Sequence, residues 1–233
     1  MVRRITVSIL FSVFAVVLFA QSAVENALTL SQFQEKLRNA REPQILDVRS
    51  PLEFSENHLK GAINFYVSDD EQFKKAISGL NKDNPVFVYS INNGRSTTVS
   101  TKLIAAGFKE VYALPGGLAH WIGAGNPIET SAGTGLSKAD FDKLITIEDV
   151  VLVDVGSKHC GACKKLAPVV EEISHEQGVK VIKIELYDNR QLAKELGIEA
   201  VPTLILYKGK TPIWTKSGTM TKNEIVDALD NSL

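Results

Sequence analysis

The sequence predicts an α/β protein built from two domains, and three observations support this. The chain has 233 residues, whereas a single domain typically has about 100–200. Residues 130–135 read Thr-Ser-Ala-Gly-Thr-Gly, a small, polar and uncharged stretch that is typical of a linker. On both sides of it, strand-like and helix-like patterns alternate, which favours an α/β architecture in each half. We therefore predict one domain over residues 28–129 and a second over residues 136–233.

The first half combines short apolar strands with helices that have recognisable ends. Ser31 and Gln34 have the spacing of a capping box and predict the start of a helix. Phe33 and Leu37 fall on the inward side of that helix. The remaining expected elements are strands over residues 44–48, 86–89 and 111–114, and a helix over residues 96–106 that ends at Gly107.

The second half shows the same kind of alternation. Ser137 and Asp140 form a capping-box pattern, and Thr221 caps a final helix in the same way. Apolar runs predict strands over residues 150–155, 179–186 and 203–207, with a shorter strand over residues 213–216. Helices are expected over residues 160–177 and 190–196, the latter closed by Gly197.

Charge and cysteine content exclude several classes of function. The chain has 26 Lys and Arg against 27 Asp and Glu, so no basic excess is present to neutralise phosphates and no nucleic-acid partner is expected. With two cysteines, neither a disulfide-stapled scaffold nor a four-thiolate zinc site can form. The four histidines lack the spacing of a zinc-binding pair, so no metal is expected.

The N-terminus has the pattern of a secretory signal peptide, predicted over residues 1–22. Arg3 and Arg4 precede an uncharged, largely apolar run over residues 5–20, and small residues follow. That run is short for a membrane span, although an uncleaved N-terminal anchor is the alternative. We therefore expect a periplasmic protein, working where thiols tend to be oxidised.

The strongest chemical signal is the motif Cys160-Gly-Ala-Cys163 between a buried strand and a helix. The free N–H groups at the start of a helix stabilise a thiolate, and the thiolate is the nucleophile of disulfide exchange. Cys163 lies one turn on, within disulfide reach, where burial and fewer free N–H groups keep its pKa higher. The alternatives are a static disulfide, half of a zinc site, or two buried free thiols.

The second half resembles the thioredoxin superfamily. The family stretch V-D-F-W-A-x-W-C-G-P-C-K-x-x-A-P aligns with residues 153–168, and G-I-x-x-x-P-T aligns with residues 197–203. The resemblance implies a mixed central sheet flanked by helices, and a cis Pro202 that faces the cysteines. It also implies that Val201 offers backbone hydrogen bonds to a substrate peptide. Gly161 and Ala162, between the cysteines, would border the same substrate.

Asp154 is the one acidic residue in an otherwise apolar strand, where burial should raise the pKa of its carboxyl group. The resemblance implies that Asp154 moves the proton of Cys163, with Lys183 as a modulator. A structural ion pair between Asp154 and Lys183 is the alternative. His159 stands where the family has Trp, and Ala162 stands where it has Pro. A protonated His159 would stabilise the thiolate of Cys160, or it is an exposed loop residue with little influence.

Two stretches of the first half carry a recognisable pattern, L-D-V-R-S-P-L-E-F over residues 46–54 and G-F-K-E-V-Y-A-L-P-G-G-L-A-H-W over residues 107–121. They match L-D-V-R-x-x-x-E-[FY] and G-F-x-x-V-x-x-L-x-G-G-x-x-x-W of rhodanese domains. The first half therefore resembles a rhodanese domain, which implies a parallel sheet flanked by helices. In active rhodaneses the loop C-x-x-x-x-R carries a catalytic cysteine. Here Ser90 holds the cysteine position, while Arg95 is kept.

Ser90 decides the expected chemistry of this half. A serine hydroxyl is barely ionised at neutral pH and cannot carry a persulfide, so we expect an inactive domain kept for binding or interface contacts. The loop and Arg95 could still bind an anion. A persulfide relay through Cys160, or an unrecognised use of Ser90, are the alternatives.

These observations predict a thiol–disulfide oxidoreductase that needs no cofactor. Cys160 would attack a protein disulfide, and Cys163 would resolve the mixed disulfide. The rivals are a thiol oxidase that donates disulfides, and a non-enzymatic protein that binds a partner. Expected partners are protein thiols and disulfides, a membrane-bound redox partner and, through the rhodanese-like domain, a second copy of the chain.

Overall fold

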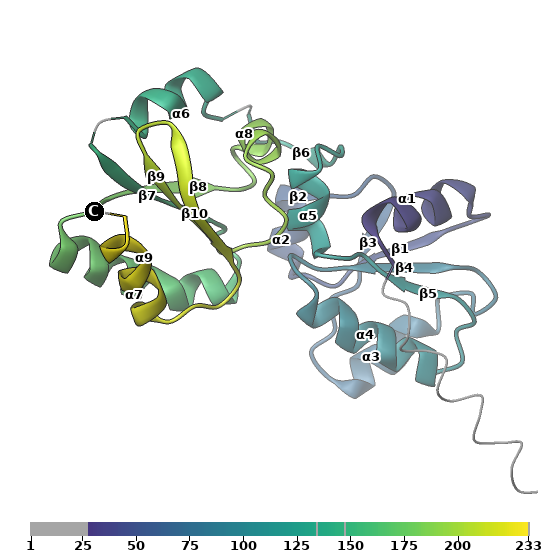
Figure 1. Ribbon diagram of the computed structural model, residues 1–233. Helices are drawn as coiled ribbons and strands as arrows, with labels where there is room; N and C mark the ends of the chain where they lie inside the picture. Colours follow the sequence, from purple (N-terminus) through teal and green to yellow (C-terminus); the bar gives the residue numbers. More distant parts are fainter. Residues whose placement is uncertain (1–27, 134, 147, 233) are drawn as a thin grey trace, which may run out of the picture.

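The computed structural model describes residues 28–133, 135–146 and 148–232 of the chain. It contains two α/β halves that lie side by side, coloured purple to teal and teal to yellow in Figure 1. The predicted signal peptide over residues 1–22, and the alternative anchor helix, lie outside these residues. Within the described part of the chain, no helix is both long and apolar enough to cross a membrane.

The N-terminal half is a parallel sheet between two layers of helices, as the resemblance to rhodanese domains implied. It has four strands, of which the sequence patterns predicted three. Its strands follow the order β3-β1-β4-β5, with β1 at Gln44–Asp47, β3 at Ala62–Asn64, β4 at Val86–Tyr89 and β5 at Val111–Ala113. The helices are α1 (Leu30–Asn39) and α5 (Gly117–Gly123) on one face, and α3 (Asp70–Ile77) and α4 (Gly94–Ala105) on the other. A short helix α2 (Pro51–Glu56) leads into a small pair of strands, β2 (Asn57–His58) and β6 (Glu129–Thr130).

The strand β4 shows why the sheet needs helices on both faces. Phe87 and Tyr89 belong to one apolar cluster, whereas Val86 and Val88 belong to another on the opposite face. All four side chains are buried. A strand that is apolar throughout is the pattern expected of a parallel strand covered on both sides.

The start of α1 corrects one sequence prediction. The N-cap is Thr29 rather than Ser31, and the capping box is completed by Gln32, whose side chain accepts a 2.8 Å hydrogen bond from the Thr29 backbone. Both pairs of residues have capping-box spacing, so the pattern alone could not choose between them. The earlier start adds Leu30 to the apolar side of the helix that also carries Phe33.

The C-terminal half is a mixed sheet, again as predicted, with strand order β10-β9-β7-β8. Strands β7 (Val150–Gly156) and β8 (Lys180–Glu185) are parallel, and β9 (Thr203–Lys208) runs antiparallel to both β7 and β10 (Thr211–Ser217). Helices α7 (Gly161–Gln177) and α9 (Lys222–Asp230) cover one face, whereas α6 (Lys138–Leu144) and α8 (Arg190–Glu195) cover the other.

Strand β10 is longer than the sequence indicated. It pairs with β9 from Thr211 to Ser217, with a register shift between Pro212 and Trp214. Because β10 is an edge strand, it tolerates a proline and exposes many of its side chains. Both features hide a strand from a search for apolar runs.

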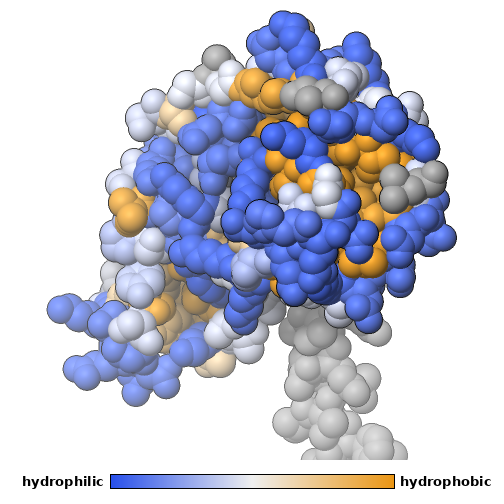
Figure 2. Space-filling view, turned by 90° about the vertical axis from the view of Figure 1, so that its left-hand side faces the viewer, coloured by the Kyte–Doolittle hydropathy of each residue, from blue (hydrophilic) through white to orange (hydrophobic). Residues whose placement is uncertain are grey.

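The surface shown in Figure 2 is mostly hydrophilic, with apolar side chains gathered in patches.

The two halves share one apolar cluster, and each half also has a cluster of its own on the other face of its sheet. The shared cluster includes Leu118 and Ile122 from α5 together with Leu192 and Ile198 from the C-terminal half. At Gly123 the approach is so close that a Cβ atom would lie 1.5 Å from the carbonyl oxygen of Ile198. A glycine is therefore required where α5 meets the C-terminal half (Figure 1).

Candidate active site

The two cysteines lie at the start of α7, where the motif predicted them. Cys160 is the N-cap of the helix and Cys163 lies in its first turn. They form a disulfide, with Cα atoms 5.2 Å apart. The backbone N–H of Cys163 points at Cys160 Sγ, 3.2 Å away. This N–H, with the positive end of the helix dipole, would stabilise a thiolate on Cys160 in the reduced protein.

The burial of the two cysteines differs from the sequence expectation. Cys160 is only 1% exposed, whereas Cys163 is half-buried. We expected the second cysteine to be the more buried, but the N-terminal half covers the first. Cys160 belongs to the apolar cluster that Ile91 and Val201 also join. Burial of Cys160 opposes ionisation of its thiol, whereas the start of the helix favours it. A low pKa for Cys160 therefore stays a prediction.

A cis peptide bond lies beside Cys160, as the resemblance implied. The bond joins Val201 to Pro202, and the carbonyl oxygen of Val201 lies 3.7 Å from Cys160 Sγ. The backbone of Val201 is therefore placed where a chain segment bound there would reach the reactive sulfur. Of the residues between the cysteines, Gly161 is exposed and Ala162 is half-buried.

Asp154 lies below Cys163 on strand β7. Both residues border the space beside Gly156. A Cβ atom added to this glycine would lie 3.6 Å from Cys163 Sγ and 3.8 Å from Asp154 Oδ1. Burial raises the pKa of Asp154, and the charge of Lys183 acts in the opposite direction. Lys183 is opposite Asp154 in the register of β7 and β8, and its side chain is exposed. Cys163 Sγ and Asp154 Oδ1 therefore border the same space beside Gly156, which places the carboxyl group in the neighbourhood of Cys163.

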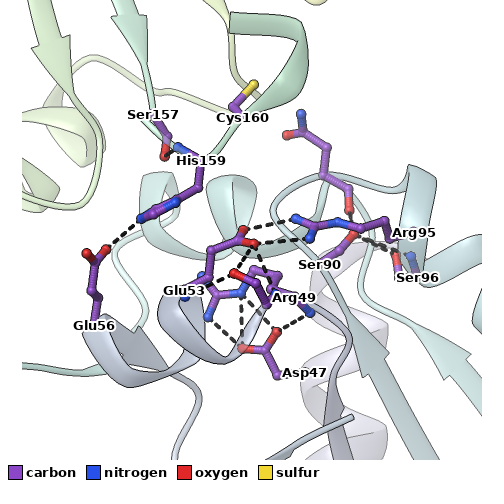
Figure 3. Close-up of polar contacts among 12 residues, drawn as sticks. Asp47, Arg49, Glu53, Glu56, Ser90, Arg95, Ser96, Ser157, His159 and Cys160 are labelled. Atoms are coloured by element: carbon purple, nitrogen blue, oxygen red, sulfur yellow. Dashed lines mark hydrogen bonds and ion pairs between the residues drawn. The ribbon is translucent and has the colours of Figure 1, made fainter. Parts of the chain in front are cut away.

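The loop that follows β4 is closed on itself around Ser90. This side chain is 1% exposed and donates a hydrogen bond to the carbonyl oxygen of Asn92. It also accepts a hydrogen bond of 3.4 Å from the backbone N–H of Ser96. Figure 3 shows Ser90 next to Ser96, which lies in the first turn of α4. The hydroxyl is therefore held by its own loop.

Arg95 is engaged by a carboxylate rather than free for an anion. Its guanidinium donates two hydrogen bonds to Glu53, of 2.9 and 3.1 Å, as Figure 3 shows. Although burial acts to raise it, hydrogen bonds from Arg95 and Ser50 hold the pKa of Glu53 below its usual range. Any anion at this loop must therefore compete with Glu53.

A buried arginine joins the two halves. Arg49 donates hydrogen bonds to Asp47 and Asn57 in its own half and one of 3.0 Å to the hydroxyl of Tyr187 in the other half. The side chains of Arg49 and Asp47 are fully buried, and Tyr187 is 3% exposed. Asp47 and Arg49 thus form a buried ion pair, and Arg49 extends it across the boundary to Tyr187.

His159 makes a second contact between the halves. Its Nε2 lies 2.8 Å from a carboxylate oxygen of Glu56, and Lys158 Nζ lies 2.8 Å from the other oxygen. Hydrogen bonds from Lys158 and His159 lower the pKa of Glu56. Figure 3 shows the imidazole directed toward Glu56. The interpretation of His159 as an exposed loop residue is wrong, because its side chain is 14% exposed.

A third contact lies at the peptide bond before Pro202. The side-chain amide of Asn92 donates a 2.7 Å hydrogen bond to the carbonyl oxygen of Val201. The N–H of Val201 lies 3.4 Å from the carboxamide oxygen of Asn92, to which it donates. Sequence reasoning missed Asn92, Glu56 and Tyr187, and no local pattern marks them. Glu53, in contrast, was part of a motif and could have been found there.

Comparison with known proteins agrees with this geometry. The family profile "Rhodanese-like domain" matches residues 29–124, and the profile "Thioredoxin" matches residues 134–231. A thioredoxin of Rickettsia felis is 37% identical over 101 residues, covering 42% of this chain and 96% of the relative. The chain belongs to the thioredoxin family.

Further relatives of the thioredoxin domain show similar coverage. Thioredoxin 1 of Nostoc sp. is 34% identical over 106 residues, covering 44% of this chain and 99% of the relative. A solved structure of a mutant thioredoxin from Halobacterium salinarum NRC-1 matches at 27% identity, with a TM-score of 0.40, over 45% of this chain and 96% of its own. The protein is thus a rhodanese-like domain followed by a thioredoxin domain with thiol–disulfide oxidoreductase chemistry.

Proposed function

We propose that this protein is a periplasmic thiol–disulfide oxidoreductase that reduces or isomerises disulfides in other proteins. The observation that carries the proposal is the position of Cys160, which caps α7 and lies beside the cis peptide bond of Val201 and Pro202. A thiolate there has hydrogen-bond donors from the helix and a backbone segment for the substrate next to it.

The exchange proceeds in two balanced steps, starting from the reduced pair. The thiolate of Cys160 attacks a substrate disulfide, so that one substrate sulfur becomes bonded to Cys160 and the other leaves as a thiolate. Asp154 then takes the proton of Cys163, and the resulting thiolate attacks the sulfur of Cys160. This second step releases the other substrate sulfur as a thiolate and leaves the Cys160–Cys163 disulfide.

The pKa of Asp154 suits this role. Because burial raises it, the carboxyl group can accept a proton nearer neutral pH than an exposed aspartate can. Two electrons pass from the cysteine pair to the substrate in each cycle. An external dithiol must therefore reduce the pair again, and we propose a membrane-bound redox partner for this step.

The rhodanese-like domain acts in this proposal as a binding and interface module without sulfurtransferase activity. Ser90 cannot form a persulfide, and its hydroxyl is held within the loop. Arg95, which would bind an anionic sulfur donor, is paired with Glu53. The periplasmic location rests on the sequence of the N-terminus, and self-association through this domain stays a prediction.

Insulin reduction by dithiothreitol tests the proposed function. We expect the mature protein to accelerate precipitation of the insulin B chain, and Cys160→Ser to remove the acceleration. Ile213→Ser, on an exposed residue of the distant strand β10, controls for the effect of an added serine. Acceleration that persists in Cys160→Ser would show that Cys160 is not the nucleophile. No acceleration by the wild-type protein would contradict the proposal.

A further inference from the structure

Asn92 makes with Val201 the pair of hydrogen bonds that a substrate peptide would make. Its carboxamide N–H donates to the carbonyl oxygen of Val201 at 2.7 Å, and its oxygen accepts from the Val201 N–H at 3.4 Å. A carboxamide has the same donor and acceptor groups as a peptide bond. The rhodanese-like loop therefore occupies the backbone groups of Val201 that the resemblance to thioredoxins assigns to a substrate peptide.

We propose that Asn92 is a specificity-determining residue, which holds the peptide-pairing position at Val201 so that only substrates able to displace it are exchanged. This inference rests on the proposed oxidoreductase function and names the substrate class. The substrates are disulfides in extended peptide segments, whose own N–H and carbonyl groups replace the carboxamide of Asn92.

The same loop also covers the nucleophile. Cys160 Sγ lies 3.7 Å from the carbonyl oxygen that accepts the hydrogen bond from Asn92. Cys160 is 1% exposed, and Ile91, the neighbour of Asn92, is 7% exposed in the same apolar cluster. Movement of the loop away from Val201 therefore frees the pairing position and uncovers the sulfur together.

Asn92 is held in place by its own domain. The carbonyl oxygen of Asn92 accepts a hydrogen bond from Ser90, and that of Ile91 accepts one of 3.0 Å from Ala119. The loop packs closely against Gly117, where an added Cβ atom would lie only 2.7 Å from Asn92 Cα. Because the carboxamide is already ordered, little conformational entropy is lost when it pairs with Val201. An incoming flexible peptide has to pay that entropy, so Asn92 is an effective competitor.

Single-turnover kinetics test this inference. Reduced protein is mixed with a synthetic peptide disulfide over a range of concentrations, and oxidation of the cysteine pair is followed by acid quench and mass analysis. For Asn92→Ala we expect the half-saturating peptide concentration to fall roughly tenfold, since two hydrogen bonds are lost. The maximal rate should stay within about twofold, because the reacting groups are unchanged.

Asn93→Ala is the matched control, because Asn93 is exposed and its side chain makes no capping hydrogen bond with α4. Its half-saturating concentration should equal that of the wild-type protein. Asn92→Asp is the second variant, since it keeps the size of the side chain but replaces the amide donor with a carboxylate that the carbonyl of Val201 repels. We expect it to act like Asn92→Ala.

Alkylation of reduced Cys160 by iodoacetamide gives a readout that does not depend on turnover. It should be faster in Asn92→Ala and Asn92→Asp than in the wild-type protein, and unchanged in Asn93→Ala. Equal alkylation rates in all four proteins would overturn the inference, as would an effect confined to the maximal rate. A third outcome separates the two proposals. If alkylation is faster in the two Asn92 variants but none of the four proteins exchanges with the peptide, the loop does cover Cys160 and the proposed function is contradicted instead.

Discussion

Arg49 of the rhodanese-like domain donates a 3.0 Å hydrogen bond to the hydroxyl of Tyr187 in the thioredoxin domain. Both side chains are buried, and Arg49 is also paired with Asp47. An unpaired polar group at such a place would cost free energy, so each domain needs the other to satisfy its buried groups. Because the two domains also share an apolar cluster, we expect them to unfold as one cooperative unit.

Tyr187→Phe should uncouple the domains. The substitution removes the acceptor of an Arg49 hydrogen bond, and we expect the free energy of unfolding to fall by roughly 1–3 kcal/mol. Each domain contains one tryptophan, Trp121 and Trp214, so intrinsic fluorescence during urea unfolding reports on both. We expect one transition in the wild-type protein and two in Tyr187→Phe. Tyr66→Phe, on a half-exposed tyrosine, serves as the control.

Asp154→Asn should change the pH dependence of stability. Burial raises the pKa of Asp154 in the folded state. Below about pH 4, the pKa of an aspartate in the unfolded chain, Asp154 is protonated in both states, and its burial costs no ionisation energy. The wild-type protein loses stability as the pH rises through the raised folded pKa. The variant does not ionise there, so it should be the more stable protein at pH 7 and no more stable at pH 4.

Urea unfolding at several pH values between 4 and 8 checks this expectation. The difference in the free energy of unfolding between the variant and the wild-type protein should grow with pH. Its full size is about 1.4 kcal/mol for each unit by which folding raises the pKa of Asp154. Asp149→Asn, on an exposed aspartate before the same strand, controls for the lost charge. A stability difference that is constant across this range would show that Asp154 is not perturbed by burial.

Asp154→Asn should also slow the second step of exchange more than the first. Proton removal from Cys163 belongs to release of the mixed disulfide, whereas attack by Cys160 does not need it. Rapid mixing with a peptide disulfide, followed by acid quench, separates the two rates. A variant that slowed only the first attack would remove Asp154 from the proposed mechanism.

The wild-type rhodanese-like domain should not produce thiocyanate from thiosulfate and cyanide. To isolate the loop, the assay uses a chain in which Cys160 and Cys163 are both replaced by Ser. Ser90→Cys in that background tests whether a thiol alone restores sulfur transfer. We expect weak activity at most, because Arg95 remains paired with Glu53. Thiocyanate production by the chain without cysteines would overturn the assignment of an inactive domain.

The sequence predicted those parts of the site that depend on local spacing. The start of α7 at Cys160 and the half-buried Asp154 on β7 follow from local patterns, whereas the cis bond before Pro202 was implied by the resemblance to thioredoxins. Two boundaries were wrong for local reasons, since Thr29 competes with Ser31 as a cap and Pro212 conceals an edge strand.

The contacts that cover the site could not be predicted in this way. Asn92 and Val201 are 109 residues apart, and His159 and Glu56 are 103 apart. Arg49 and Tyr187 are separated by 138 residues. Such pairs depend on how two complete domains pack, and neither periodicity nor motif spacing carries that information. The burial of Cys160 is therefore a property of the domain pair.

Trapping of the mixed disulfide tests whether Cys160 is the nucleophile. Reduced Cys163→Ser protein is mixed with a peptide disulfide, and the adduct is located by mass mapping after alkylation. We expect a stable mixed disulfide on Cys160, because the thiol that resolves it has been removed. We also expect no such adduct in Cys160→Ser, although Cys163 is the more exposed of the two cysteines. An adduct on Cys163 in Cys160→Ser, with none on Cys160 in Cys163→Ser, would contradict the account.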